Sequence, residues 1–410
     1  MTSPNWESWL VSADDHIIEP PNLWTSRVAS KYQGSCPQVR EDDRGEAWWF
    51  DGKRVEVSGF VVWAGVPETE VDPRAVRYDE IPKATYDAKA RLELMNDQGI
   101  LASIPFPNMP RFCGQEFSEC RDRDLGMACL QAYNDYMIDE WNATSPARMV
   151  ANILIPFWDP KLAAAEIDRM AERGARTLCF SENFAQLGWP SVHRDYWDPV
   201  FDACEANDMP LSIHVGSSSK IPTTGPDAPL LLGSVTTSSM ASMTFLDFAL
   251  SQTFVKHPRL RVTLSEGGIG WVPYTLAQLD RNTHHYDYFN RFELKIHDMT
   301  DVEIIKRAQD VKSWPHGDMR ALDVYKTFFR GCYIAASHVL SRETIEALGT
   351  DCFIAEVDYP HLDSTYPNTM KQLDDLLEGF PKEDQRRLRQ QNGIEWYGLD
   401  LEAMKRELPS

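Results

Sequence analysis

Eight short apolar segments recur along this chain, and stretches with helical periodicity separate most of them. Runs of this length, bounded by turn residues, predict parallel strands that are covered on both faces. The predicted strands are Trp9–Asp14, Ile100–Phe106, Met149–Ile155, Arg176–Phe180, Pro210–Val215, Leu260–Ser265, Gly331–Ala335 and Cys352–Val357.

Helical segments alternate with these strands. The predicted helices are Lys83–Gln98, Arg121–Trp141, Pro160–Arg173, Asp195–Ala206, Ser239–Val255 and Arg342–Leu348. Asp159 is a good N-cap for the third of them, and Gly174 is a good residue to end it. Eight strands alternating with helices over 410 residues predict one domain, a closed (β/α)8 barrel of the TIM type. A doubly wound open sheet is the alternative.

Two segments do not fit a minimal barrel. Residues 20–82 separate the first strand from its helix, and residues 282–328 separate the sixth strand from the seventh. Both follow the C-terminal end of a strand, where barrel enzymes hold their active sites, so both are predicted to form a lid. Within the first segment, Ala47–Val62 alternates like a hairpin around Asp51-Gly52.

Charge and composition narrow the possible partners. A net charge of −21 argues against binding to nucleic acid, because the chain repels phosphate backbones. The sequence has no run of 18 apolar residues and no recognisable signal peptide, so a cytoplasmic protein without a membrane helix is expected. The eight cysteines form no CxxC pair, which predicts reduced, mostly buried thiols.

The first predicted strand ends in Asp14-Asp15-His16. Strand alternation sends Asp14 and His16 to the same face, where a carboxylate and an imidazole two residues apart can chelate a metal ion. Taken alone, the same pattern also fits a surface turn.

Other predicted strands end on residues of the same kind. Glu182 follows strand four, His214 ends strand five, Glu266 follows strand six and Asp358 follows strand eight. Singly, each has an ordinary structural explanation, such as a histidine in the core. Together, so many carboxylates at one barrel mouth would repel each other, and a divalent cation would compensate for that repulsion. The sequence therefore predicts a metal site.

Several longer stretches resemble the amidohydrolase superfamily, in the division that also holds aminocarboxymuconate-semialdehyde decarboxylase and resorcylate decarboxylase. The resemblance covers most of the chain and rests on residues 14–24 (DDHIIEPPNLW), 181–183 (SEN), 212–216 (SIHVG), 264–273 (LSEGGIGWVP) and 356–365 (EVDYPHLDST).

The resemblance implies that Asp14, His16, His214 and Asp358 bind the metal. Decarboxylase members usually carry a histidine at the end of strand six, where this chain has Glu266. The carbamylated lysine that other members use at the end of strand four is replaced by Glu182. Glu182 and Glu266 are therefore predicted to join the ligands, in a site that suits one or two ions of Zn, Mn or Fe.

Further residues are candidates for roles around the metal. Asp358, Glu266 and His285 are predicted to move protons, and His361, His284 and Trp271 to bind substrate. Glu19 and Glu356 are expected to orient other groups, and His338 is a weaker candidate for the site. The remaining histidines, which we expect to be structural or exposed, are His193, His257, His297 and His316.

Three functions follow. The first is metal-dependent hydrolysis, or non-oxidative decarboxylation, of a small cyclic or aromatic carboxylated substrate, through a metal-polarised carbonyl or an activated water. The second is oxygenation by a dinuclear non-haem iron site, as in a monooxygenase. The third is binding without catalysis. The fold resembled here commonly dimerises, so a homodimer is expected.

Overall fold

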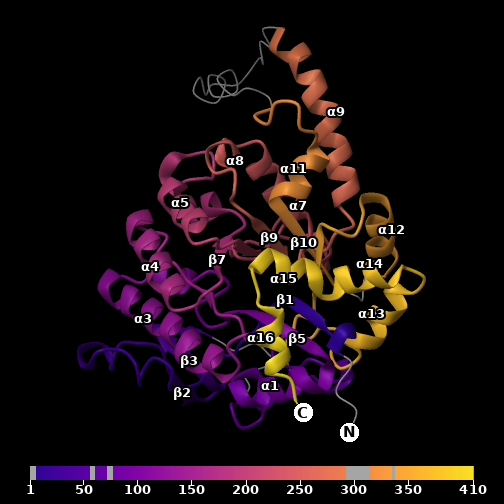
Figure 1. Ribbon diagram of the computed structural model, residues 1–410. Coiled ribbons are helices and arrows are strands. Elements are labelled where there is room, and N and C mark those ends of the chain that lie inside the picture. The colour runs from indigo at the N-terminus through magenta and orange to yellow at the C-terminus, as the bar shows by residue number, and fades with distance from the viewer. Residues whose placement is uncertain (1–5, 56–60, 72–76, 292–313, 335–337, 410) are drawn as a thin grey trace.

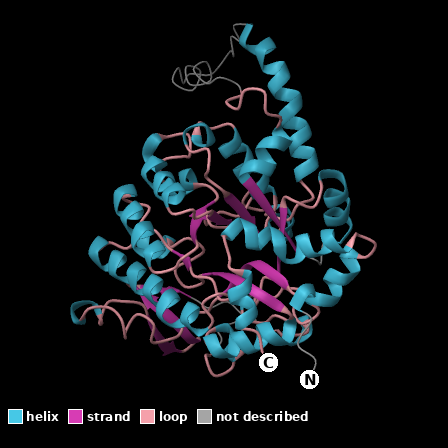
Figure 2. Ribbon diagram, viewed as in Figure 1, coloured by secondary structure: helices cyan, strands magenta, loops and turns pink. Residues whose placement is uncertain are grey.

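Parallel strands surrounded by helices form the centre of the structure, a computed structural model (Figures 1 and 2). It describes residues 6–55, 61–71, 77–291, 314–334 and 338–409. The barrel strands among these residues are β1 (Leu10–His16), β5 (Ile100–Phe106), β6 (Asn152–Ile153), β7 (Thr177–Ser181), β8 (Leu211–His214), β9 (Val262–Ser265), β10 (Phe329–Ile334) and β11 (Phe353–Glu356).

Backbone hydrogen bonds close these strands into a ring. The strands from β6 to β11 form a parallel sheet in sequence order, and β1 pairs with β5. Ser103 of β5 joins the two sheets on one side, where its N–H donates to Arg148 O at 2.9 Å. Asp358 joins them on the other side, where its N–H donates to Asp14 O at 2.8 Å. The predicted barrel is therefore confirmed, and the alternative of an open sheet is wrong.

Helices cover the outside of the barrel. Those that follow the strands are α1 (Ala88–Gln98), α3 (Arg123–Tyr136), α4 (Pro160–Glu172), α5 (Asp198–Ala206), α7 (Ser239–Ala249), α9 (Val272–Arg291), α11 (Ala321–Phe328) and α12 (His338–Leu348). Four C-terminal helices follow the last strand: α13 (Thr369–Leu377), α14 (Lys382–Arg386), α15 (Asn392–Tyr397) and α16 (Leu401–Arg406).

The predicted helices differ from the observed ones mainly at their ends. The helix predicted to begin at Lys83 begins at Ala88 instead, because the Asp87 side chain caps it by accepting from Ala90 N. The helix predicted over Ser239–Val255 is interrupted after Ala249 and resumes as α8 (Thr253–Lys256). Residues 282–291, predicted to begin an irregular insertion, continue α9, which extends away from the barrel in Figure 1.

The insertion after β1 forms a three-stranded antiparallel sheet of β2 (Gln38–Asp42), β3 (Gly45–Phe50) and β4 (Lys53–Val55). The predicted turn at Asp51-Gly52 joins β3 to β4, and both residues have the positive φ that such a turn requires (48° and 80°). Trp48 of this sheet packs edge-on against Trp24, which packs in turn against Phe117 after β5. The insertion thus packs on the segment that follows β5.

The C-terminal helices close the opposite end. Trp396 Nε1 and Tyr397 OH of α15 both donate to Thr263 Oγ1 inside the barrel, each at 2.9 Å. All eight cysteines are buried and unpaired, as predicted. Within the described ranges, no helix has both the length and the hydropathy needed to cross a bilayer.

Candidate metal centre

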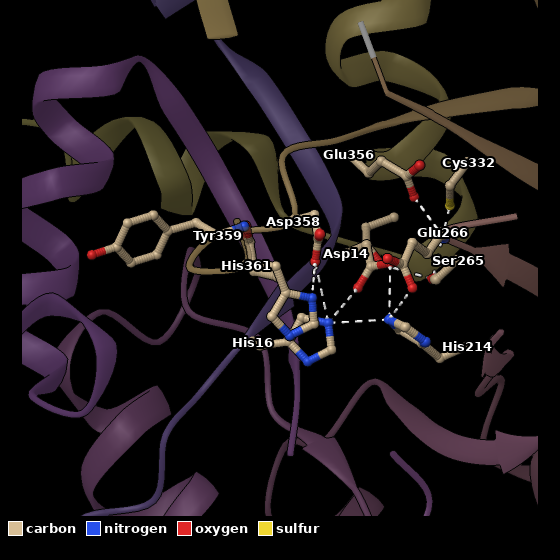
Figure 3. A network of polar contacts seen from close by, with 12 residues as sticks. Asp14, His16, His214, Ser265, Glu266, Cys332, Glu356, Asp358, Tyr359 and His361 are labelled. Atoms are coloured by element: carbon tan, nitrogen blue, oxygen red, sulfur yellow. Dashed lines mark hydrogen bonds and ion pairs between the residues drawn. The ribbon is translucent and has the colours of Figure 1, made fainter. Parts of the chain in front are cut away.

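Two aspartates and two histidines meet at the C-terminal ends of three strands (Figure 3). Asp14 and His16 belong to β1, His214 ends β8, and Asp358 lies two residues beyond β11. All four residues are fully buried. Each offers a ligand atom, and these atoms lie within 4.8 Å of one another. We refer to these residues as the four-ligand group.

Distances within the group suit a single ion. His16 Nε2 lies 3.1 Å from His214 Nε2, 3.6 Å from Asp14 Oδ1 and 3.3 Å from Asp358 Oδ1. His214 Nε2 lies 3.5 Å from Asp14 Oδ2. Ligands bound about 2.1 Å from one ion are separated by roughly 3–4 Å, so the group could bind an ion with little rearrangement.

One carboxylate of the group lacks hydrogen bonds that would stabilise it. Among the described residues, neither oxygen of Asp14 has a hydrogen-bond partner, whereas Asp358 Oδ1 lies 3.0 Å from His361 Nδ1. Burying an uncompensated carboxylate costs several kcal/mol, even after the surroundings relax. A divalent cation would remove that cost for Asp14, so the donor set fits the metal that the sequence predicts.

A hydrogen bond sets the ring chemistry of His214. Its Nδ1 lies 2.5 Å from Val215 O, which can only accept, so Nδ1 carries the proton. In the neutral ring this leaves a lone pair on Nε2, the atom that faces His16 and Asp14. A ring oriented in this way by a backbone carbonyl is typical of histidines that bind metals.

Burial controls the ionisation of the group. It raises the pKa of Asp14 well above its usual value, and repulsion from Asp358 adds to the shift. Burial also lowers the pKa of His214 to about 4 and that of His16 well below its usual value. Both imidazoles are therefore neutral at physiological pH, which is the form that binds a metal.

One residue of the group and one beside it have backbone conformations that are unfavourable for L-amino acids. Asp358 has φ +60° and Glu266 has φ +55°. Such conformations cost about 1–3 kcal/mol each and persist only where the surroundings hold them. Here the Asp358 N–H donates to Asp14 O, and the Glu266 N–H donates to Glu356 Oε2 at 2.9 Å. These bonds turn both carboxylates inward, as Figure 3 shows.

Glu266 lies beside the four-ligand group. Its Oε2 is 3.4 Å from His214 Nε2, and its side chain is 29% exposed. Burial of the carboxyl raises its pKa well above the usual value, and repulsion from Asp358 adds to this. Glu356, which holds the Glu266 backbone, is fully buried, and burial raises its pKa to about 8.

His361 also joins the site. Its Nδ1 lies 3.0 Å from Asp358 Oδ1, and its ring stacks on the His16 ring with centroids 3.7 Å apart. Glu266, Asp358, His361 and Asp363 form a second set of possible ligands, which shares Asp358 with the first. Sequence reasoning did not include Asp363, although the spacing of Asp358, His361 and Asp363 after strand eight could have suggested it.

The structure does not bring Glu182 into either set. Its carboxylate accepts hydrogen bonds from Gly216 N at 3.0 Å, Ser218 N at 3.1 Å and Ser218 Oγ at 2.7 Å. These donors lie in the loop that follows His214. A carboxylate with its oxygens occupied in this way is placed to orient that loop, and Glu182 as a ligand stays a prediction.

The remaining candidates are placed less centrally. Trp271 Nε1 donates to the carbonyls of Gly267 (3.1 Å) and Gly268 (3.0 Å), so the indole fixes the loop after β9. His284 and His285 lie on α9, but their side chains, like that of His338, fall outside the described residues. Glu19 accepts from Asn108 N and Met109 N, both at 2.9 Å, and so orients the loop after β5 as expected.

Sequence reasoning missed Phe112, which lies on that loop after β5. Its ring centroid is 4.1 Å from that of His214 and 5.2 Å from that of His16. The half-buried ring therefore forms an apolar wall against both imidazoles of the four-ligand group. No pattern in the sequence marks it, because its role depends on where the loop folds.

The chain belongs to the amidohydrolase family whose model, Amidohydro_2, matches residues 82–399. This match includes His214, Glu266 and Asp358 but begins after Asp14 and His16. The comparison with curated protein sequences finds no match.

Solved structures share the fold. An amidohydrolase from Mycobacterium avium subsp. paratuberculosis has a TM-score of 0.70 at 18% identity, with 95% of this chain and 99% of that one covered. 5-Carboxyvanillate decarboxylase from Novosphingobium aromaticivorans, with bound manganese and a nitrobenzoic acid, has a TM-score of 0.63 at 16% identity, over 97% and 99%. Dihydroxybenzoic acid decarboxylase from Polaromonas, with manganese and 2-nitroresorcinol, has a TM-score of 0.60 at 15% identity, over 96% and 98%.

Proposed function

We propose that this protein is a divalent-metal-dependent carboxy-lyase that releases CO2 from a small aromatic carboxylate without an oxidant. The observation that carries the proposal is the buried four-ligand group, in which Asp14 has no hydrogen-bonding partner among the described residues. Two structural neighbours are aromatic acid decarboxylases that hold manganese, which supports this reaction over others on the same fold.

In this proposal, Asp14, His16, His214 and Asp358 hold the metal. A bound divalent cation would neutralise the carboxylates and polarise an oxygen of the substrate. The Phe112 ring, beside both histidines, would lie against the face of an aromatic substrate and exclude water from it.

Loss of CO2 replaces a carboxylate on a ring carbon with a proton. The C–C bond breaks, its electron pair stays with the ring, and one proton is taken up, so the reaction needs a proton donor but no oxidant. Glu266 and His361 are the candidates, because both lie beside the four-ligand group. Glu266 contacts His214, and His361 contacts Asp358. Glu266 is the more exposed, which suits exchange of its proton with solvent.

The insertions are proposed to form a lid over this site. Ala64 of the first insertion donates its N–H to Pro360 O, two residues after Asp358, at 3.0 Å. The first insertion therefore reaches the loop that carries a metal ligand. Residues 292–313 of the second insertion fall outside the described residues, so its role stays a prediction.

Oxygenation at a dinuclear iron site is the second candidate. It is favoured by the second ligand set of Glu266, Asp358, His361 and Asp363. Asp358 belongs to both sets, so the two sets could hold one ion each. Glu266 is also the position at which this chain departs from the histidine that the decarboxylases usually carry.

A parallel assay separates the reactions. We would load metal-free protein with Mn²⁺ or Fe²⁺ and supply a panel of hydroxylated benzoates that includes 2,6-dihydroxybenzoate and 5-carboxyvanillate, together with aryl esters and lactones. The proposal expects CO2 release with Mn²⁺ and no oxygen uptake. Oxygen uptake only with Fe²⁺ would favour the second candidate, and cleavage of only the esters or lactones would establish a hydrolase instead.

A further inference from the structure

Arg91 places a fully buried guanidinium behind the strand that carries Asp14 and His16. It lies on α1, where Nη2 donates to His16 O and Nε donates to Ala84 O, both at 2.7 Å. The remaining nitrogen, Nη1, has no hydrogen-bond partner among the described residues. A buried arginine so incompletely satisfied costs stability, so its position calls for an explanation other than stability.

The guanidinium also reaches the segment after β11 that carries Asp358. Its central carbon lies 4.7 Å from the centroid of the Tyr359 ring, and Tyr359 directly follows Asp358. A cation over an aromatic face is attracted to it, and the attraction strengthens away from water. Arg91 therefore contacts the backbone of His16 and the side chain of Tyr359, the residue next to Asp358.

Asp15 completes this connection. Its Oδ1 accepts from Tyr359 N at 3.2 Å, and its Oδ2 accepts from Ser103 Oγ on β5. Burial lowers the pKa of Arg91, and attraction to Asp15 opposes that shift. Arg91, Asp15 and Tyr359 together tie the ends of β1 and β11 at the place where the barrel closes.

We propose that Arg91 is the positioning residue of the metal centre, setting the separation of His16 and Asp358 through the His16 carbonyl and the Tyr359 ring. Arg91 touches neither the metal position nor a substrate, so its effect must pass through these two ligands. This inference rests on the metal centre of the proposed function and not on the reaction.

Arg148 provides a matched control. It is also a fully buried arginine, and it donates to Leu101 O and Ile100 O at 3.0 Å and to Asn96 Oδ1 at 2.7 Å. Leu101 and Ile100 begin β5, so Arg148 lies at the end of that strand away from the metal ligands. Replacing either arginine removes a similar set of buried contacts, but only Arg91 contacts the ligand strands at their C-terminal ends.

The test uses Co²⁺ as the probe, because its visible absorption reports the ligand geometry. Metal-free wild type, Arg91→Met, Arg91→Lys and Arg148→Met are titrated with Co²⁺, and their unfolding temperatures are measured. Arg91→Met is expected to weaken Co²⁺ binding about 10- to 100-fold and to alter the spectrum, because mutation of a residue that orients metal ligands typically has an effect of this size. Arg91→Lys is expected to fall between this variant and wild type, and Arg148→Met to match wild type in affinity and spectrum.

Equal Co²⁺ affinity and an unchanged spectrum in Arg91→Met would overturn the inference. If Arg91→Met does not fold, Tyr359→Leu, which removes the ring, is compared with Tyr359→Phe, which keeps it. An altered spectrum only in Tyr359→Leu supports the inference, and wild-type spectra in both overturn it. Failure of wild type to bind Co²⁺ would instead overturn the metal centre itself, so the two failures are distinguishable.

Discussion

The Nε2 atoms of His16 and His214 face each other across 3.1 Å at the centre of the buried group. His214 keeps its proton on Nδ1, because that atom bonds to Val215 O. Burial lowers the pKa of both rings, so neither imidazole is expected to take up an extra proton and become charged. Two neutral imidazoles beside two buried carboxylates form an arrangement that a cation stabilises.

Replacing Asp14 with asparagine is expected to separate folding from metal binding. Asp14→Asn removes a buried carboxyl that Asp358 repels, so the metal-free variant should unfold at a temperature no lower than that of wild type. Wild type should gain about 2.7 kcal/mol at a Mn²⁺ concentration 100 times its Kd, and the variant should gain almost nothing. Calorimetry checks this, with the exposed Asp79→Asn as control. A Mn²⁺-dependent gain equal to that of wild type would show that Asp14 does not bind the ion.

Metal binding is expected to release protons and to strengthen as pH rises. Burial raises the pKa of Asp14 well above its usual value, so the metal-free carboxyl keeps a proton to a higher pH than an exposed aspartate does, and the ion must displace any proton still bound. His214, with a pKa of about 4, is already neutral and releases none. Titration calorimetry at about pH 7 in two buffers of different ionisation enthalpy counts the protons. Binding that is independent of pH between about pH 6 and about pH 8 would contradict the burial of an uncompensated Asp14.

Glu182→Gln is expected to lower stability without changing the amount of metal bound. The amide retains one oxygen for the donors at Gly216 and Ser218, so one of their hydrogen bonds is lost, at a cost of about 1–3 kcal/mol. Chemical denaturation measures the loss, and elemental analysis measures the metal. A drop in metal content in folded Glu182→Gln would restore Glu182 as a ligand.

Glycine at position 266 is expected to stabilise the protein relative to alanine. Glu266 has φ +55°, a conformation that glycine adopts freely and alanine does not. Glu266→Gly should therefore be more stable than Glu266→Ala by about 1 kcal/mol, while both lose the carboxyl beside His214. Equal unfolding free energies for the two variants would mean that the backbone at residue 266 is not strained.

The sequence predicts the barrel well because parallel strands with helices on both faces are buried on both sides and therefore consist of short apolar runs. The predicted strand Ile100–Phe106 matches β5 exactly in its bounds, and the other seven overlap their strands. Strand alternation also places Asp14 and His16 correctly, since both point into the same buried group. The first residue of a helix is harder to predict from the sequence. The start of α1, for example, is set by a single hydrogen bond from Ala90 N to the Asp87 side chain.

The details of the site depend on loops, and the sequence constrains these less. Glu182 resembles a ligand in sequence because it follows a strand, but the loop after His214 supplies three donors that occupy it. Phe112 contacts the histidines from the loop after β5. The conformation of this loop depends on hydrogen bonds such as those that Asn108 N and Met109 N donate to Glu19. The predicted homodimer and the roles of His284, His285 and Trp271 stay predictions.

Metal content after reconstitution tests the central claim most directly. Metal-free wild type, His214→Ala and the control His193→Ala, which alters an exposed histidine paired with Asp247, are incubated with Mn²⁺, desalted and analysed for manganese. The four-ligand group predicts one manganese per chain in wild type and in His193→Ala, and almost none in His214→Ala. No manganese in folded wild type, or equal amounts in wild type and His214→Ala, would contradict it.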